Sequence, residues 1–224
     1  MSKEKQTLKS QNLKTVILFI IYCLAIYIVF FNNPTDFWTK LNNQVINLNS
    51  KDGLFMLFSP LISIILTSVF SSNIKECISL WKLKNPLPGH RAFTEYAPKD
   101  TRIDNDVLKT RLGSIPTDET EQNKTWYKIY KGVSELYTIQ DSHKYFLLFR
   151  ELTSVAFLFL IVTPFSFVFT SKPINHTILY TIIIAAHYIV LAICTQNTGK
   201  RLVCNVLAEY TSTSTTPPNS SMSV

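Results

Sequence analysis

The chain has 224 residues, of which 46% are hydrophobic and only 17% are charged, and its formal net charge is +7. This composition is too apolar for an ordinary soluble domain and predicts an integral membrane protein. The five glycines are widely spaced, with no two closer than 19 residues, which excludes a glycine-rich loop for dinucleotides or nucleoside triphosphates.

Four runs without Asp, Glu, Lys or Arg hold most of the apolar residues. They contain 17, 18, 18 and 19 residues and cover 15–31, 53–70, 153–170 and 177–195. At about 1.5 Å per residue, each run makes a helix that crosses a bilayer core once its flanking residues are counted. The runs are apolar on nearly every side, which excludes barrel strands. We predict an all-α integral membrane protein with about four transmembrane helices and a small helical insertion between the second and third.

The distribution of basic residues predicts the orientation. Nineteen of the 22 Lys and Arg residues lie in 1–14, 71–152 and 196–224, and three lie in the loops 32–52 and 171–176. By the positive-inside rule, the first three segments are cytoplasmic and both loops are external. No small-residue cleavage motif follows the first run, so we expect a retained anchor in the inner (plasma) membrane.

The insertion 71–152 is predicted to be a set of short helices. After the second run, four residues recur at helical spacing: Ile74, Cys77, Ile78 and Trp81. This amphipathic pattern fits a helix at the headgroup level or a helix packed on its neighbours. Prolines then end the helix at Asn85 to Gly89.

Three further helices follow from capping signals and apolar periodicity. We expect one from Asp104 to Leu112 that ends at Gly113, one that starts near Pro116 and Thr117, and one from Asp141 or Ser142 that continues into the third run. Movement of the insertion would then be transmitted directly to the membrane part. The tail is rich in Ser and Thr and is predicted to be disordered from about residue 211.

His187 is the candidate functional residue in the membrane, because it lies near the middle of the fourth run, where a charged imidazole is costly. Tyr180 and Cys194 lie seven residues to either side and share its helix face. The ordinary interpretation is a neutral histidine bonded to a neighbouring helix. The alternative is a role in gating or proton transfer.

Hydroxyl side chains form stripes on two of the runs. Ser59, Ser63 and Thr67 are spaced by four residues in the second run, and Thr163, Ser166 and Thr170 recur in the third. Such stripes commonly hold helices together. They could also line a polar path if several copies assembled.

Two groups of basic residues are candidates for binding a partner or an anion. Lys124, Lys128 and Lys131 form a stripe beside Trp126, and His90, Arg91 and Arg102 form a second group. Cations interleaved with aromatic rings can bind anionic lipids or single-stranded nucleic acid. The ordinary interpretation of the lysine stripe is a solvated helix face.

Enzyme signatures are absent from the sequence, so we predict no catalytic residue, no cofactor and no metal site. The four cysteines are at least ten residues apart and form neither a disulfide framework nor a CxxC pair.

Three segments of the insertion carry a resemblance to a known family. They are PLPGHRAF at 86–93, DTRID at 100–104 and QNKTWYKIY at 122–130. Through them the chain resembles small transmembrane effectors of bacterial anti-phage systems of the retron type. The resemblance implies an abortive-infection effector that is restrained by a reverse transcriptase with its RNA or RNA–DNA product. Those effectors are described with two spans, whereas four are predicted here.

These observations lead to three hypotheses. The first is a regulated effector that permeabilises the bilayer, with self-association of its spans. The second is a non-enzymatic scaffold or receptor that tethers a cytoplasmic partner. The third is a small channel or transporter subunit, for which His187 and the hydroxyl stripes would be indispensable.

Overall fold

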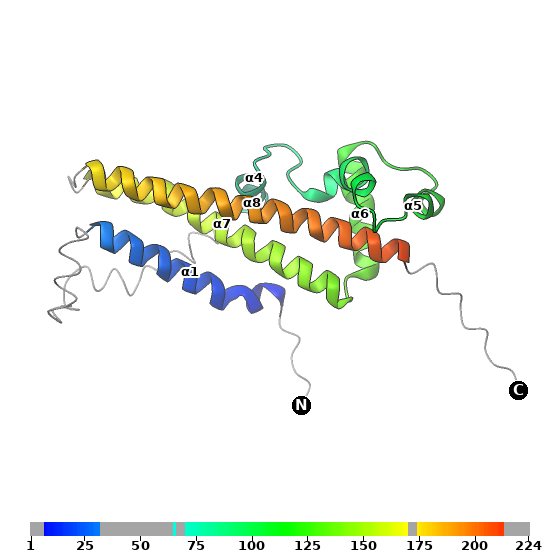
Figure 1. The fold of residues 1–224 in the computed structure, drawn as a ribbon, viewed down its shortest axis with the longest axis horizontal. Helices are drawn as coiled ribbons and strands as arrows, with labels where there is room; N and C mark the ends of the chain where they lie inside the picture. Colours follow the sequence, from blue (N-terminus) through cyan, green and yellow to red (C-terminus); the bar gives the residue numbers. More distant parts are fainter. Residues whose placement is uncertain (1–6, 32–64, 66–69, 170–173, 213–224) are drawn as a thin grey trace, which may run out of the picture. The chain divides into compact units, whose positions relative to one another are not determined.

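The computed structural model describes residues 7–31, 65, 70–169 and 174–212, and every element in these residues is helical (Figure 1). The second predicted span, 53–70, lies outside the described residues except for Ile65 and Phe70, and so does the loop 32–52. The tail beyond Ser212 also lies outside them.

Three helices are long and apolar enough to cross a membrane. They are α1 (Leu8–Phe31), α7 (Tyr137–Phe169) and α8 (Ile174–Ser212). They contain the first and fourth predicted runs and residues 153–169 of the third. The described part of the chain is therefore all helical and contains three helices of membrane-spanning length.

Helices α7 and α8 extend well beyond their apolar runs. The prediction that α7 begins at Asp141 or Ser142 is wrong, because the helix already begins at Tyr137. Ser142 does not cap the helix, since its hydroxyl donates to the Thr138 carbonyl one turn earlier, at 2.7 Å. Ile139 is fully buried, which gives the first turn an apolar anchor. As expected, α7 continues from the insertion into the third run without a break, with Pro164 inside it.

The chain divides into two compact units. The first comprises residues 1–81 and 147–194, and the second comprises 82–146 and 195–224. Both α7 and α8 contribute residues to each unit.

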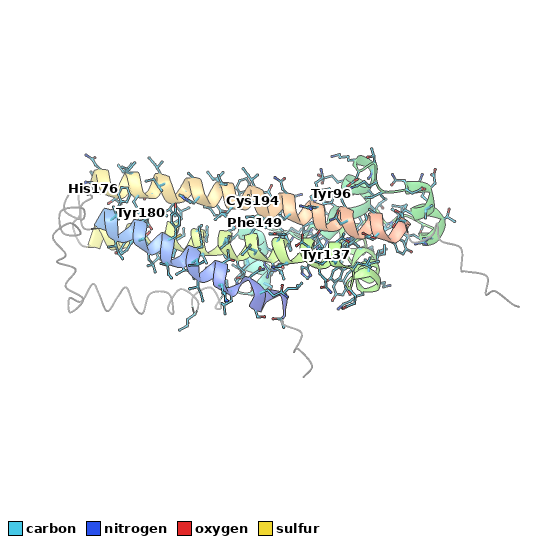
Figure 2. The ribbon with its side chains drawn as sticks, turned by 60° about the horizontal axis from the view of Figure 1, so that its bottom comes forward. Tyr96, Tyr137, Phe149, His176, Tyr180 and Cys194 are labelled. Carbon is cyan, nitrogen blue, oxygen red and sulfur yellow. The ribbon has the colours of Figure 1, made fainter. Side chains whose placement is uncertain are left out.

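In the first unit, α1 lies alongside α7 and α8 (Figures 1 and 2). Tyr180 of α8 lies at the centre of their shared core, fully buried against aromatic rings of α1. The core is completed by a further seven residues: Ile20, Cys23, Leu24, Tyr27, Val155, Phe159 and Ile184. Large apolar side chains are exposed outside it, for example Leu18 at 66% and Ile182 at 59%. An exposed apolar surface of this kind is typical of helices that face lipid.

The first unit also contains α4 (Ser72–Leu80), which follows the second predicted run. Ser71 caps it, because its hydroxyl accepts a hydrogen bond from the Ile74 amide at 3.3 Å. The helix ends at Trp81, whose φ of 55° lies in the left-handed region.

The second unit begins with three short elements: η1 (Pro88–Arg91), η2 (Ala92–Tyr96) and η3 (Ala97–Lys99). Next come α5 (Asn105–Leu112) and α6 (Glu119–Val133). Asp104 caps α5, which ends at Gly113 as predicted. Helix α6 starts two or three residues later than expected because Asp118 is its N-cap.

Two glycines allow close packing in the second unit. A Cβ on Gly89 of η1 would lie 2.3 Å from the Asn123 side-chain oxygen and 2.9 Å from the Trp126 ring of α6. A Cβ on Gly199 of α8 would lie 2.7 Å from the Pro88 ring. The segment around η1 is therefore fitted tightly against α6 and the C-terminal part of α8.

Candidate functional site

Four charged side chains meet between α4 and α7, and we call them the α4–α7 ion cluster. Lys75 Nζ lies 2.6 Å from Glu151 Oε2. The Arg150 guanidinium lies 3.2 Å from Glu151 through one nitrogen and 3.2 Å from Glu76 through another. Positive and negative groups therefore alternate in the order Lys75, Glu151, Arg150, Glu76.

The cluster is shielded from solvent. The four side chains are between 6% and 19% exposed, with Arg150 the most buried. Ser154 lies beneath it, fully buried, and its hydroxyl donates to the Arg150 carbonyl at 2.8 Å. Among the described residues, Arg150 Nε is buried without a hydrogen-bond partner. The guanidinium is thus held by its two terminal nitrogens.

Burial and ion pairing have opposite effects on the pKa of Glu76 in this cluster. Burial raises the pKa of the Glu76 carboxyl, and the adjacent Arg150 guanidinium opposes the rise. Removing one member of a buried pair typically costs about 3 to 5 kcal/mol, because the other charge is left uncompensated. The formal charges of the cluster sum to zero, so it is favourable only while α4 and α7 stay in contact.

The ion cluster turns the charged face of α4 inward. Lys75, Glu76 and Ser79 are buried, whereas Ile74 is 45% exposed and Trp81 is 51% exposed. A helix on the surface of a soluble protein has the opposite arrangement. The amphipathic pattern was correctly recognised from the sequence, and the structure shows that the polar side packs on the neighbouring helix.

The sequence alone does not predict this cluster, since Lys75 and Arg150 count only among the basic residues of 71–152 that indicate the orientation. A local signal was present. Lys75–Glu76 and Arg150–Glu151 are adjacent opposite charges at the two ends of the insertion, each beside an apolar run. Nothing in the sequence alone shows that the two pairs meet.

His187 forms two hydrogen bonds within the first unit. Its Nδ1 lies 2.7 Å from the Ile183 carbonyl, which can only accept, so Nδ1 carries the proton. Its Nε2 lies 2.8 Å from the Tyr22 hydroxyl of α1. In the neutral ring Nε2 is the acceptor and Tyr22 the donor. His187 is thus bonded to a neighbouring helix through Tyr22.

Tyr180, the other described membrane candidate on α8, takes part in the packing of the helices. Tyr180 lies in the core, and its ring packs edge-on against Tyr27. Ser59, Ser63 and Thr67 lie outside the described residues. Thr163 is buried and donates to the Phe159 carbonyl of its own helix, as Thr181 does to Thr177. Each of these two hydroxyls therefore satisfies a carbonyl one turn earlier in its own helix.

The three basic residues of the second candidate group do not converge on one pocket. His90 is buried, and its Nδ1 lies 2.8 Å from the Glu119 carbonyl. Arg91 donates to the Pro86 carbonyl at 3.2 Å, which holds the proline turn. Arg102 binds Asp100 at 2.7 Å and the Asn205 side chain at 2.9 Å. Each group has a partner within the chain.

The lysine stripe of α6 is exposed. Lys124 pairs with Glu121 at 2.7 Å, Lys131 lies over the Tyr127 ring at 5.2 Å, and Lys128 is exposed beside them. Trp126 points the other way, toward Gly89, and stacks on Tyr130 with ring centroids 5.6 Å apart. The lysines therefore form an outer face of α6, and the tryptophan belongs to its packed side.

Gln122 is a second buried polar residue that the sequence did not indicate. It is 1% exposed, and its Oε1 accepts from the Phe93 amide and from the amide and hydroxyl of Thr94, at 3.1 to 3.2 Å. Its amide donates to the Thr117 carbonyl at 3.0 Å. One side chain thus joins η2 to the start of α6.

Within the described residues, no group of three or more His, Cys, Asp or Glu side chains is arranged to hold a metal ion. In comparisons with known proteins, no family model, no curated protein and no solved structure matches this chain. The function must therefore be argued from the helices and the ion cluster themselves.

Proposed function

We propose that this protein is a regulated membrane effector that permeabilises the bacterial inner membrane when a cytoplasmic partner or signal releases it. In this proposal both termini and the insertion are cytoplasmic, and the protein acts without catalysing a reaction. The active form is an assembly of several copies, because the few helices of one chain enclose no sizeable aqueous lumen.

The α4–α7 ion cluster carries the proposal. A regulated protein needs an element with two discrete arrangements that a signal can bias. The ion cluster supplies such an element, since it is stable when the four charges are paired and strongly unfavourable when one partner is withdrawn. Release of α4 would expose the polar side of α7 to its apolar neighbours and disturb their packing.

Helix continuity supports transmission of the signal. Helix α7 carries both Ile139, from the second compact unit, and Arg150, from the first, in one unbroken helix. A rotation or shift of α7 caused by a partner would therefore move Arg150 as well.

The antiviral setting of the proposal rests on the sequence resemblance alone. On that basis the restraining partner is a reverse transcriptase with its RNA or RNA–DNA product, and phage activity is the releasing signal. The proposed role of the ion cluster does not depend on this setting.

The test is to express the full chain from a tightly controlled promoter in bacteria while following growth, a membrane-potential dye and propidium uptake. Arg150→Met should depolarise cells at lower expression than the unchanged chain, because it disrupts the cluster. Tyr127→Phe, on the exposed face of α6, is the matched control. If the unchanged chain and Arg150→Met both insert into the membrane and neither depolarises the cells at any expression level, the effector proposal is wrong.

The exposed lysine face of α6 favours a second candidate function, a scaffold that tethers an anionic cytoplasmic partner. If the protein is a scaffold, changing Lys124, Lys128 and Lys131 to Gln should abolish co-purification of that partner. If it is an effector, the same change should leave its toxicity unchanged. Co-purification of the same partner with the unchanged chain and with the Gln variant would contradict the scaffold.

A further inference from the structure

The apolar side of α4 is exposed in the described structure, although its charged side is buried. Ile74 and Trp81 are 45% and 51% exposed, and Cys77 and Ile78 between them are partly exposed. Water is a poor environment for such a surface, at about 25 cal/mol for each Å² of apolar area. The side of α4 that faces away from α7 therefore suits an apolar or interfacial environment.

The backbone at Trp81 points to a role for its side chain. Trp81 ends α4 with φ at 55°, a conformation that costs a bulky residue roughly 1 to 2 kcal/mol and that glycine adopts freely. The cap itself therefore does not require tryptophan. Its indole N–H donates to the Tyr188 hydroxyl at 3.0 Å, and that hydroxyl donates to the Ile78 carbonyl at 2.9 Å.

Trp81 and Tyr188 lie near the end of the exposed apolar surface of α8. The Tyr188 ring also contacts Phe157 of α7, with centroids 5.6 Å apart. The exposed apolar residues of α8 continue past Tyr188 and end at Ile193, and Arg150 and Glu151 lie about two turns from Phe157 on α7. Helix α4 thus contacts both helices where their apolar surface gives way to polar residues.

We infer that α4 is an interfacial helix: Ile74, Cys77, Ile78 and Trp81 lie at the boundary between headgroups and acyl chains, with the ion cluster beneath them. Tryptophan and tyrosine are enriched at this depth because their rings are apolar and each carries one polar group. The occupant of the exposed face is lipid, because that face continues the exposed apolar surface of α8. The inference depends on α7 and α8 crossing a membrane and does not depend on the proposed effector activity.

The test is depth-dependent fluorescence quenching of Trp81 in the full chain, reconstituted into vesicles of phosphatidylcholine and phosphatidylglycerol. The chain also contains Trp38 and Trp126. Subtracting the emission of a Trp81→Phe variant therefore isolates Trp81 without changing the tryptophan that packs on Gly89. Lipids brominated near the headgroup end of the acyl chains should remove most of the difference emission. Lipids brominated near the terminal methyl should remove much less.

Two outcomes would overturn the inference. Strong quenching by aqueous iodide with no effect of brominated lipids would place Trp81 in water. Protection from both quenchers would place it against protein, either another segment of this chain or a second copy. Trp81→Gly provides an independent check, because it relieves the left-handed strain. If Trp81 were only a cap, this variant would be at least as stable in vesicles as the unchanged chain. The inference predicts instead that the substitution lowers the stability of the chain, and that it does so more in vesicles than in detergent.

Discussion

The Arg150 guanidinium of α7 lies 3.2 Å from the Glu76 carboxylate of α4, and both side chains are largely buried. The two residues are 74 positions apart in the sequence, so their contact fixes α4 against α7. Buried pairs of this kind contribute little net stability compared with well-packed apolar residues, but they strongly disfavour alternative arrangements.

Arg150→Met should therefore destabilise the protein by about 3 to 5 kcal/mol, toward the lower end if Glu76 takes up a proton. Lys75→Met is the matched comparison, because it leaves Glu151 its contact with Arg150, and it should cost less. The free energy of unfolding can be measured by denaturant titration in detergent micelles. Equal costs for the two variants would contradict the central position assigned to Arg150.

Gly89→Ala should destabilise the second unit by about 1 to 3 kcal/mol, because the added methyl group would meet Asn123 and Trp126. Gly132→Ala is the control on α6, since nothing lies within 4 Å of its Cβ position. That change should stabilise the helix by up to about 1 kcal/mol. Thermal unfolding followed by circular dichroism distinguishes the two. A stabilising Gly89→Ala would show that η1 is not packed as described.

Gln122→Leu should cost about 2 to 4 kcal/mol, because it removes the acceptor for the Phe93 and Thr94 donors inside the unit. Gln122→Glu keeps the acceptor, and in its protonated form it can also donate to the Thr117 carbonyl. Its cost should therefore be smaller at low pH than at neutral pH, where a carboxylate would be buried beside that carbonyl. Limited proteolysis between η2 and α6 is a suitable measurement. If the Leu variant resists cleavage as well as the unchanged chain does, the role assigned to the carboxamide is wrong.

The pair of Tyr22 and His187 should show a small coupling. Interhelical hydrogen bonds in membrane proteins average about 0.6 kcal/mol, so a double-mutant cycle with Tyr22→Phe and His187→Ala should give a value near that. Neither change should alter the pH dependence of any leak, because both ring nitrogens of His187 are engaged in hydrogen bonds within the first unit. A leak whose pH dependence disappears in His187→Ala would instead support proton transfer.

Asp100 should make the second unit sensitive to acid. The hydrogen bond from Arg102 holds the pKa of the Asp100 carboxyl well below its usual range. The unfolded chain therefore binds a proton first, near pH 4, so this stabilisation is present above about pH 4 and is lost as the pH falls below it. Arg102 is more than half exposed, so the contribution should stay at roughly 1 kcal/mol or below and should weaken in high salt.

The corresponding measurement compares the melting temperatures of the unchanged chain and Asp100→Asn between neutral pH and about pH 3. The difference between them should be constant at neutral pH and should shrink as the pH falls below about 4. A difference that grows on acidification would show that another group is responsible.

The sequence predicted those features that depend on neighbouring residues. Apolar runs without charges indicated the helices α1, α7 and α8, and Asp104 and Gly113 marked both ends of α5 because capping is local chemistry. The start of α7 was misplaced, because Ile139 is anchored by burial, which the local pattern does not reveal. Neither the ion cluster nor the direction faced by α4 could be predicted. Both depend on Lys75 and Glu76 meeting residues more than 70 positions away.

Each helix of the ion cluster is electrically neutral by itself, since Lys75 and Glu76 cancel on α4 and Arg150 and Glu151 cancel on α7. A transmembrane voltage does work only on net charge that moves through the field, about 2.3 kcal/mol per elementary charge for each 100 mV. Separating α4 from α7 would move no net charge along the membrane normal. Opening of the ion cluster should therefore be indifferent to membrane potential, so that loss of the potential neither triggers the opening nor prevents it.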